Sequence, residues 1–203
     1  MKIGIVGNGF VGSSVAFGFS PTTGCDSEIK IYDKDSSKAT DTLESTLTSD
    51  FIFVSVPTPS NPNGSINLDV VYNVFEEMNS LNHRTDNVIL LRSTVTPGTT
   101  RKLQRKFKNL NIVFNPEFLT ERSAKLDFIN QARFILGGRK KDTNKVEKLM
   151  KWRFGETMPV IKTNYETAEL IKYMNNCFFA TKVSFLNEMY QIADKCGADW
   201  DMA

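Results

Sequence analysis

The sequence predicts an α/β fold, in which a Rossmann-type, doubly wound and mostly parallel sheet is followed by a long central α-helix. Three observations predict it. Short apolar segments alternate with helix-like segments as far as about residue 162, and parallel strands covered by helices on both faces need such nearly continuous apolar runs. A glycine-rich turn joins the first apolar segment to the first amphipathic one. A helical periodicity then extends from about Tyr165 to Cys196.

The first strand and the first helix enclose the motif Gly7-Asn8-Gly9-Phe10-Val11-Gly12. In a dinucleotide-binding turn the first glycine permits a tight turn, the second lets the backbone approach a pyrophosphate, and the third lets the helix pack close to the strand. The helix then directs unpaired N–H groups and the positive end of its dipole at the phosphates. We therefore expect a dinucleotide to bind at this turn.

The second strand ends on Asp33, 21 residues after Gly12. A carboxylate at this position accepts hydrogen bonds from the hydroxyls of the adenosine ribose and repels a 2′-phosphate, which favours NAD over NADP. Lys34 and Lys38 lie nearby in the sequence, and because either cation could meet a phosphate, NADP stays open as the alternative.

The remaining elements follow in alternation. Strands are expected at residues 2–6, 28–32, 51–56, 87–92, 111–114, 133–136 and 158–161, and helices at residues 10–19, 39–47, 69–81, 99–107 and 142–151. The last helix, from about Tyr165 to Cys196, would be on the order of 45 Å long. One small domain cannot bury all of it, so a second domain or a second subunit should cover part of its surface.

Three motifs stand at the carboxyl ends of predicted strands, where open α/β sheets bind their ligands. They are Ser55-Val56-Pro57-Thr58-Pro59, Ser93-Thr94-Val95-Thr96-Pro97-Gly98-Thr99, and Asn115-Pro116-Glu117-Phe118-Leu119-Thr120-Glu121. On the long helix, Glu169, Lys172 and Asn176 share one face at spacings of three and four. An ammonium at Lys172, with Asn176 as a companion donor, would stabilise an oxyanion that develops at a carbonyl or an alcohol.

Composition narrows the class of protein. The net charge is +2 and basic residues are not interleaved with aromatic ones, so we expect no nucleic-acid partner. The uncharged apolar runs fall short of the ~20 residues that a membrane span needs, so no membrane partner is expected. The three widely spaced cysteines indicate reduced thiols in a cytoplasmic protein, with neither a metal site nor a disulfide framework. The single histidine, His83, lies in a polar loop and is expected to be exposed.

Taken together, GNGFVG, SVPTP, STVTPGTT, NPEFL-x-E and the helix motif E-x-x-K-x-x-x-N resemble the UDP-glucose/GDP-mannose 6-dehydrogenase family over essentially the whole chain. The resemblance implies an enzyme of polysaccharide biosynthesis that uses NAD to oxidise the 6-hydroxyl of a nucleotide sugar, of the UDP-glucose to UDP-glucuronate type. It implies catalytic roles for Glu117, near the reacting carbon and water, and for Lys172 and Asn176, which steady the alkoxide. NAD would contact Gly7, Gly9, Phe10, Val11, Gly12, Asp33, Lys38, Pro57, Thr58, Ser93, Thr94 and Glu121.

On this basis residues 1–162 form an NAD-binding Rossmann-like domain, and residues 163–203 begin a truncated central helical domain through which the protein would form a homodimer. The family's cysteine nucleophile lies in a later GFGGxCxPKD-type segment that this sequence lacks, and its second Rossmann-like domain is missing as well. Arg122 also replaces a frequent glycine, and the link from Asp33 to Phe51 is short. We therefore expect the N-terminal, cofactor-binding part of a longer enzyme, inactive alone.

Two alternatives stay open. The chain could be a stand-alone reductase similar to the β-hydroxyacid dehydrogenases, which carry out one hydride transfer with a lysine–asparagine pair and need no cysteine. It could instead be a non-catalytic NAD-binding or dimerisation module that pairs subunits through the long helix.

Overall fold

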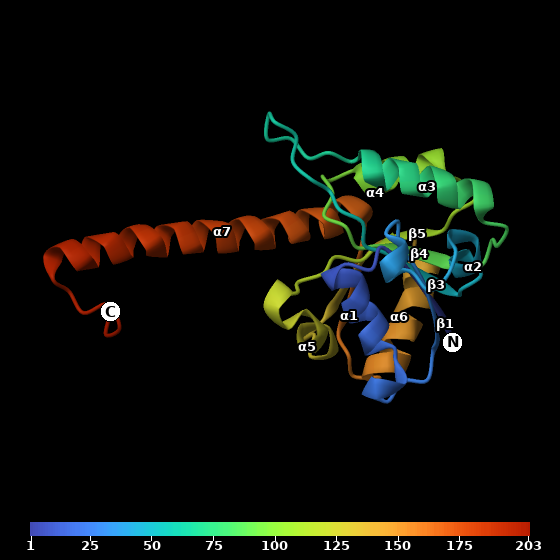
Figure 1. Ribbon diagram of the computed structural model, residues 1–203, viewed down its shortest axis with the longest axis horizontal. Coiled ribbons are helices and arrows are strands. Elements are labelled where there is room, and N and C mark those ends of the chain that lie inside the picture. Colours follow the sequence, from blue (N-terminus) through green and yellow to red (C-terminus); the bar gives the residue numbers. More distant parts are fainter.

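The computed structural model describes residues 1–203 and is built on one seven-stranded sheet (Figure 1). The strand order is β2-β1-β3-β4-β5-β6-β7, and every neighbouring pair is parallel except β5 and β6. The strands are β1 (Lys2–Val6), β2 (Glu28–Tyr32), β3 (Phe51–Val54), β4 (Val88–Leu91), β5 (Ile112–Phe114), β6 (Phe134–Gly138) and β7 (Val160–Thr163).

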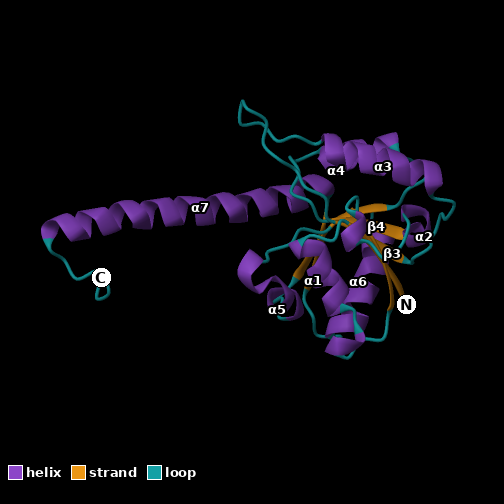
Figure 2. Cartoon of the chain, in the orientation of Figure 1, coloured by secondary structure: helices purple, strands orange, loops and turns teal.

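Helices cover both faces of the sheet (Figure 2). One buried cluster lies between the sheet and helices α2, α3, α4 and the start of α7, and a second lies between the sheet and helices α1, α5 and α6. Alternation along β3 divides its side chains between them, because Ile52 and Val54 enter the first cluster and Phe53 the second. The helices are α1 (Phe10–Gly18), α2 (Leu43–Leu47), α3 (Asp69–Leu81), α4 (Thr99–Lys106), α5 (Ala124–Ile129), α6 (Lys140–Phe154) and α7 (Tyr165–Cys196).

The predicted fold class is confirmed, and the predicted bounds of α3 and α7 agree with the structure. Two features went unpredicted. Helix α5 is only six residues long, too short to show a helical period in the sequence. Strand β6 runs antiparallel to β5. The connection between them, which contains α5, leaves β5 and enters β6 at the same end of the strands.

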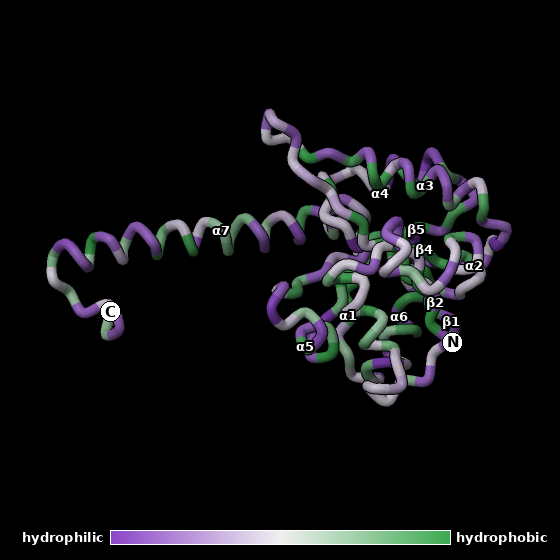
Figure 3. The backbone as a smooth tube through the Cα atoms, viewed as in Figure 1, coloured by the Kyte–Doolittle hydropathy of each residue, from purple (hydrophilic) through white to green (hydrophobic).

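Helix α7 leaves the body of the molecule after its first turns and extends far beyond it (Figure 1). Large apolar side chains remain exposed along this extension, including Met174, Phe178, Phe185, Met189 and Ile192. The tube in Figure 3 shows green hydrophobic segments alternating with purple ones along α7. The expectation that one domain cannot bury this helix is therefore confirmed. Neither α7 nor another helix combines the length and the apolar character that crossing a membrane requires.

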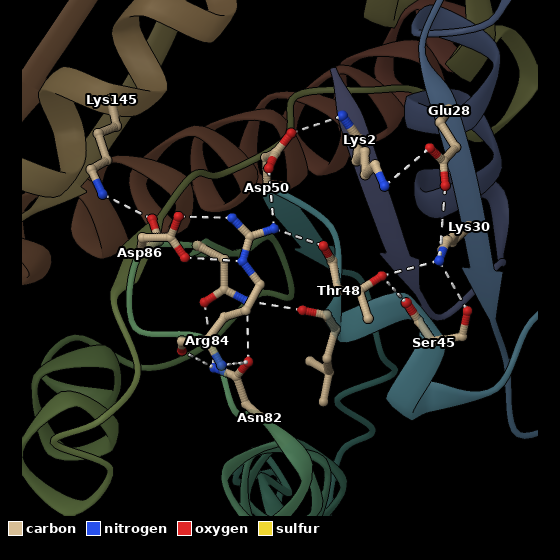
Figure 4. A network of polar contacts seen from close by, with 12 residues as sticks. Lys2, Glu28, Lys30, Ser45, Thr48, Asp50, Asn82, Arg84, Asp86 and Lys145 are labelled. Carbon is tan, nitrogen blue, oxygen red and sulfur yellow. Dashed lines mark hydrogen bonds and ion pairs between the residues drawn. The ribbon is translucent and has the colours of Figure 1, made fainter.

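A network of hydrogen bonds and ion pairs lies at the amino ends of β1, β3 and β4 (Figure 4). Arg84 donates to the carbonyl of Thr48 at 2.7 Å, to Asp50 at 3.2 Å and to both carboxylate oxygens of Asp86. Lys145 of α6 donates to the carbonyl of Asp86 at 2.8 Å. These contacts lie at the end of the sheet opposite the glycine-rich turn, so they belong to the scaffold rather than to a ligand site.

Candidate functional site

The glycine-rich turn has the geometry that its sequence predicts. Gly7 has a φ of +90°, which disfavours other residues, and a Cβ there would lie 2.5 Å from the carbonyl oxygen of Ser55. A Cβ on Gly12 would lie 1.9 Å from the carbonyl oxygen of Gly7, so only glycine lets α1 pack this close to β1. A Cβ on Gly9 would meet nothing within 4 Å. The second glycine therefore presents bare backbone to open space.

The N-terminus of α1 is suited to an anion. No side chain caps it, and no acidic residue lies in its first turn. The N–H groups of Phe10, Val11 and Gly12 precede the first intrahelical hydrogen bonds, so they and the helix dipole are available to a phosphate. The fit to a dinucleotide diphosphate rests on these donors and on the open space at Gly9.

Asp33 lies beside this turn and is held by backbone donors. Its Oδ2 accepts a hydrogen bond from the N–H of Asn8 at 2.6 Å, and its Oδ1 accepts one from the N–H of Asp35 at 2.9 Å. The side-chain amide of Asn8 donates to the carbonyl of Lys38 at 2.8 Å, which joins the segment after β2 to the turn. Each carboxylate oxygen retains further acceptor capacity for a ribose hydroxyl.

A cleft of about 450 Å³ extends from the glycine-rich turn across the carboxyl ends of β3 and β4. Its walls bring together most of the residues that the sequence assigned to cofactor binding, which are Gly7, Gly9, Phe10, Val11, Asp33, Lys38, Pro57, Thr58, Ser93 and Thr94. Glu117 and Arg92 line it as well. A second cleft of about 720 Å³ adjoins it at Gly7, Asp33, Val56 and Pro57, and reaches α3 at Val70 and Val74.

Ser93 joins two of the strand-end motifs to each other. Its hydroxyl donates to the carbonyl of Val56 at 2.7 Å and accepts from the N–H of the same residue at 3.0 Å. The Ser93 hydroxyl is therefore already hydrogen-bonded to the backbone in the wall of the cleft. The hydroxyl of the neighbouring Thr94 has no such hydrogen bond to Val56.

Glu117 and Lys172 form a buried ion pair at one end of the cleft. The Nζ of Lys172 lies 2.7 Å from Oε1 of Glu117 and donates to the carbonyl oxygen of Glu117 at 2.6 Å. The other carboxylate oxygen accepts from the N–H of Leu119 at 2.7 Å. The two side chains are only 5% and 11% exposed, so water scarcely screens the pair. The structure therefore brings together a residue after β5 and one on α7, and the catalytic roles of the two stay a prediction.

Arg92 is a cation at the cleft that the sequence motifs did not indicate. It is 1% exposed, its Nη1 donates to Oδ1 of Asn115 at 2.5 Å, and its Nε and Nη2 have no acceptor. Its guanidinium lies 5.6 Å from the centre of the Phe128 ring. Burial lowers the pKa of Arg92 to about 10, and the charge of Glu117 opposes this shift. The sequence feature that could have indicated this residue is the position of a cation directly after the wholly apolar strand β4.

Two glutamates anchor the root of α7 to α4. Glu169 accepts hydrogen bonds from the N–H of Gly98 at 2.5 Å, and from the N–H and the hydroxyl of Thr100 at 2.7 and 2.6 Å. Burial raises the pKa of Glu169, and these hydrogen bonds oppose the shift. Glu166 forms a two-pronged ion pair with Arg101, whose hydrogen bonds lower the pKa of Glu166 to about 2. Glu169 thus caps the N-terminus of α4, whereas Lys172 pairs with Glu117.

Lys172 contacts Glu117 but does not itself line the cleft, and the remaining predicted residues lie outside it. Asn176 is exposed one turn beyond Lys172, together with Cys177 and Phe178. Glu121 lines a neighbouring hollow with Phe10, Ser13 and Arg122. Gly12 lies beneath the turn, where it packs against Gly7. His83 is exposed, as expected, and no group of three or more histidine, cysteine, aspartate or glutamate side chains is arranged to hold a metal ion.

Comparison with known proteins shows which family the chain belongs to. Residues 30–154 match the NAD-binding domain of the UDP-glucose/GDP-mannose dehydrogenase family, and residues 166–203 match its central domain. The chain belongs to the UDP-glucose/GDP-mannose dehydrogenase family. NAD is therefore the cofactor of its N-terminal domain.

Individual members of the family are similar to the chain in sequence and in structure. UDP-glucose 6-dehydrogenase of Rickettsia prowazekii is 36% identical over 155 residues, covering 74% of this chain and 36% of that protein. The structure of GDP-mannose dehydrogenase from Pseudomonas aeruginosa superposes with a TM-score of 0.83 at 26% identity, covering 98% of this chain and 54% of that one. UDP-glucose dehydrogenase from Pyrobaculum islandicum gives a TM-score of 0.81 at 25% identity, with the same coverage. The chain thus spans between about a third and about half the length of these relatives.

Proposed function

We propose that this chain is the cofactor-binding part of an NAD-dependent dehydrogenase that oxidises the 6-hydroxyl of a nucleotide sugar, of the UDP-glucose to UDP-glucuronate type. One observation carries the proposal. Glu117, which holds Lys172 in an ion pair, lines one end of a cleft whose other end is the glycine-rich turn with Asp33. Cofactor and reacting groups can therefore share one continuous space.

In this proposal the dinucleotide lies along the cleft. Asp33 holds the adenosine ribose, with Lys38 beside it, and the adenine occupies the adjoining cleft between Asp33 and α3. The N–H groups at the start of α1 hold the diphosphate. Pro57 and Thr58 form the facing wall, and the nicotinamide end reaches Thr94 and Glu117.

Lys172 and Glu117 then supply the chemistry of this half of the enzyme. NAD, when bound, accepts a hydride from the alcohol carbon of the substrate. That transfer becomes easier as the hydroxyl loses its proton, and the buried ammonium of Lys172 stabilises the alkoxide that results. Glu117 holds the ammonium in place. Asn176, one turn further along α7, would add a second donor once the substrate and the rest of the enzyme surround it.

We further propose that residues 1–162 are the NAD-binding domain and that residues 163–203 begin a central domain through which two copies of the protein pair. The exposed apolar side chains of α7 support this pairing, because such a row of side chains is normally covered. A nucleotide-sugar substrate and three free cysteines fit a cytoplasmic enzyme that supplies polysaccharide synthesis.

Calorimetric titration of the full chain with NAD and NADP, followed by an assay of NADH formation from UDP-glucose, tests the proposal. We expect NAD to bind, NADP to bind more weakly, and UDP-glucose to give little or no turnover by this chain alone. Absence of NAD binding at millimolar cofactor would contradict the proposal. Steady NADH formation from a small β-hydroxyacid would instead identify a stand-alone reductase, and a stable dimer without affinity for NAD would identify a dimerisation module.

A further inference from the structure

The buried cation Arg92 has no role in the function proposed above. It follows β4, lines the cleft beside Ser93 and Thr94, and is shielded from water. We propose that Arg92 biases the site toward the reduced cofactor, because its fixed positive charge opposes the cationic nicotinamide of NAD⁺ and not the uncharged ring of NADH. This inference rests on the proposed placement of NAD, with its nicotinamide at the end of the cleft that holds Glu117.

The balance of charge at this end of the cleft supports the inference. Lys172 and Glu117 neutralise each other as a close ion pair. Arg92, whose hydrogen-bond partner Asn115 is neutral, adds a second cation to this pair, so the three charged groups together carry one net positive charge. The nearest other carboxylate in this region of the sequence, Glu121, is exposed in a separate hollow, where solvent screens it. The bound nicotinamide would therefore face a net positive environment.

The contacts of Arg92 with Asn115 and with the Phe128 ring do not by themselves explain an arginine here. A buried charge with unpartnered donors opposes folding, and an apolar side chain of similar size generally serves stability better. Two of the three guanidinium nitrogens of Arg92 have no acceptor in the protein. A neutral amide such as glutamine could still donate to Asn115. What arginine supplies here and glutamine would not is a positive charge.

The sign and size of the effect follow from the charge change on reduction. NAD⁺ gains a hydride, which is two electrons and one proton, from the alcohol carbon, while the hydroxyl proton leaves to solvent, so the nicotinamide loses one positive charge. In general, two unit charges about 6–8 Å apart at an effective dielectric constant of about 20 interact strongly enough to shift a binding equilibrium by one to two orders of magnitude. Partial screening reduces the expected effect to about tenfold.

The affinities of NADH and NAD⁺ for the full chain test the inference without any turnover. NADH is titrated by its fluorescence, NAD⁺ by competition against it, and the ratio of the two dissociation constants is compared among the unaltered chain, Arg92→Gln and Arg92→Lys. We expect the unaltered chain to prefer NADH by about tenfold or more. Arg92→Gln should lose most of that preference, and Arg92→Lys, which keeps the charge, should retain most of it.

Lys38→Gln is the matched control, because it removes one positive charge at the adenosine end of the same cleft. It should weaken both nucleotides alike and leave the ratio unchanged. An unaltered ratio in Arg92→Gln, or equal losses of both affinities in Arg92→Gln and Arg92→Lys, would overturn the inference. A ratio of one or below in the unaltered chain would overturn it without any variant. If neither nucleotide binds, the proposed function fails and this inference fails with it. If both bind and Arg92→Gln leaves the ratio of the two dissociation constants unchanged, only this inference fails.

Discussion

Replacing Lys172 by methionine should strongly destabilise the folded chain. The ammonium of Lys172 makes two hydrogen bonds to Glu117, at 2.6 and 2.7 Å, in a site where the two side chains are 5% and 11% exposed. The substitution removes the cation and leaves the Glu117 carboxylate buried with only the N–H of Leu119 as a partner. Breaking a buried pair in this way costs about 3–5 kcal/mol. For a chain of this length that corresponds to a fall in Tm of roughly 6–20 °C.

Urea denaturation followed by circular dichroism measures the loss, and a double-mutant cycle assigns it. Lys172→Met combined with Glu117→Leu removes both charges, so most of the lost stability should return, because no buried charge is left unpaired. Asn176→Ala is the control on the same helix, and since Asn176 is exposed its effect should stay within about 0.5 kcal/mol. The reasoning is refuted if Lys172→Met costs less than about 1 kcal/mol, or if the losses of the two single variants simply add in the double variant.

Three further predictions concern the cleft and the root of α7. Gly12→Ala places a Cβ against the carbonyl of Gly7, so calorimetry should show at least about a tenfold loss of NAD affinity, whereas a normal affinity would contradict the assigned close packing. Asp33→Asn should lower the preference for NAD over NADP by about tenfold, and the exposed Asp26→Asn should leave it unchanged. The depressed pKa of Glu166, about 2 against its ordinary 4.5, means that its pairing with Arg101 stabilises the fold above pH 4.5 and that this contribution is lost as the pH falls toward 2. Because Glu166 is 38% exposed, the difference in stability between the unaltered chain and Glu166→Gln should be no more than about 1 kcal/mol at pH 7, and it should vanish near pH 2 in urea titrations.

Sequence pattern predicted the cleft well because parallel strands place their carboxyl ends at one edge of a sheet. Gly9, Asp33, Thr58 and Thr94 come from separate stretches of the chain, yet the order of apolar segments was enough to bring them together. Spacing along a helix also predicted that Glu169, Lys172 and Asn176 share one face of α7. What spacing could not predict was the partner of each side chain, since Glu169 reaches residues about 70 positions earlier in the chain.

The unpredicted parts share a physical cause. Arg92 occupies a position that alternation along β4 assigns to the buried cluster around Phe128, where an apolar residue is the normal expectation. Its burial depends on Asn115, which follows β5, and on Phe128, which lies in α5, so no local sequence pattern predicts it. Helix α5, which supplies Phe128, is likewise fixed by packing, because six residues carry too little periodicity to indicate a helix.

The contacts at the root of α7 connect the cleft to whatever covers the exposed part of that helix. Glu166 and Glu169 bind α4, which directly follows the Ser93–Thr94 motif, while Lys172 binds the segment after β5 that carries Glu117. About two turns of α7, from Glu166 to Lys172, therefore fix two of the three strand-end motifs relative to each other. Because an α-helix is stiff over such lengths, a partner that binds near Phe185 or Met189 holds the orientation of this root as well. The chain alone already forms the Lys172–Glu117 pair, so in the proposed enzyme a partner that covers α7 would take up a fixed orientation relative to this pair.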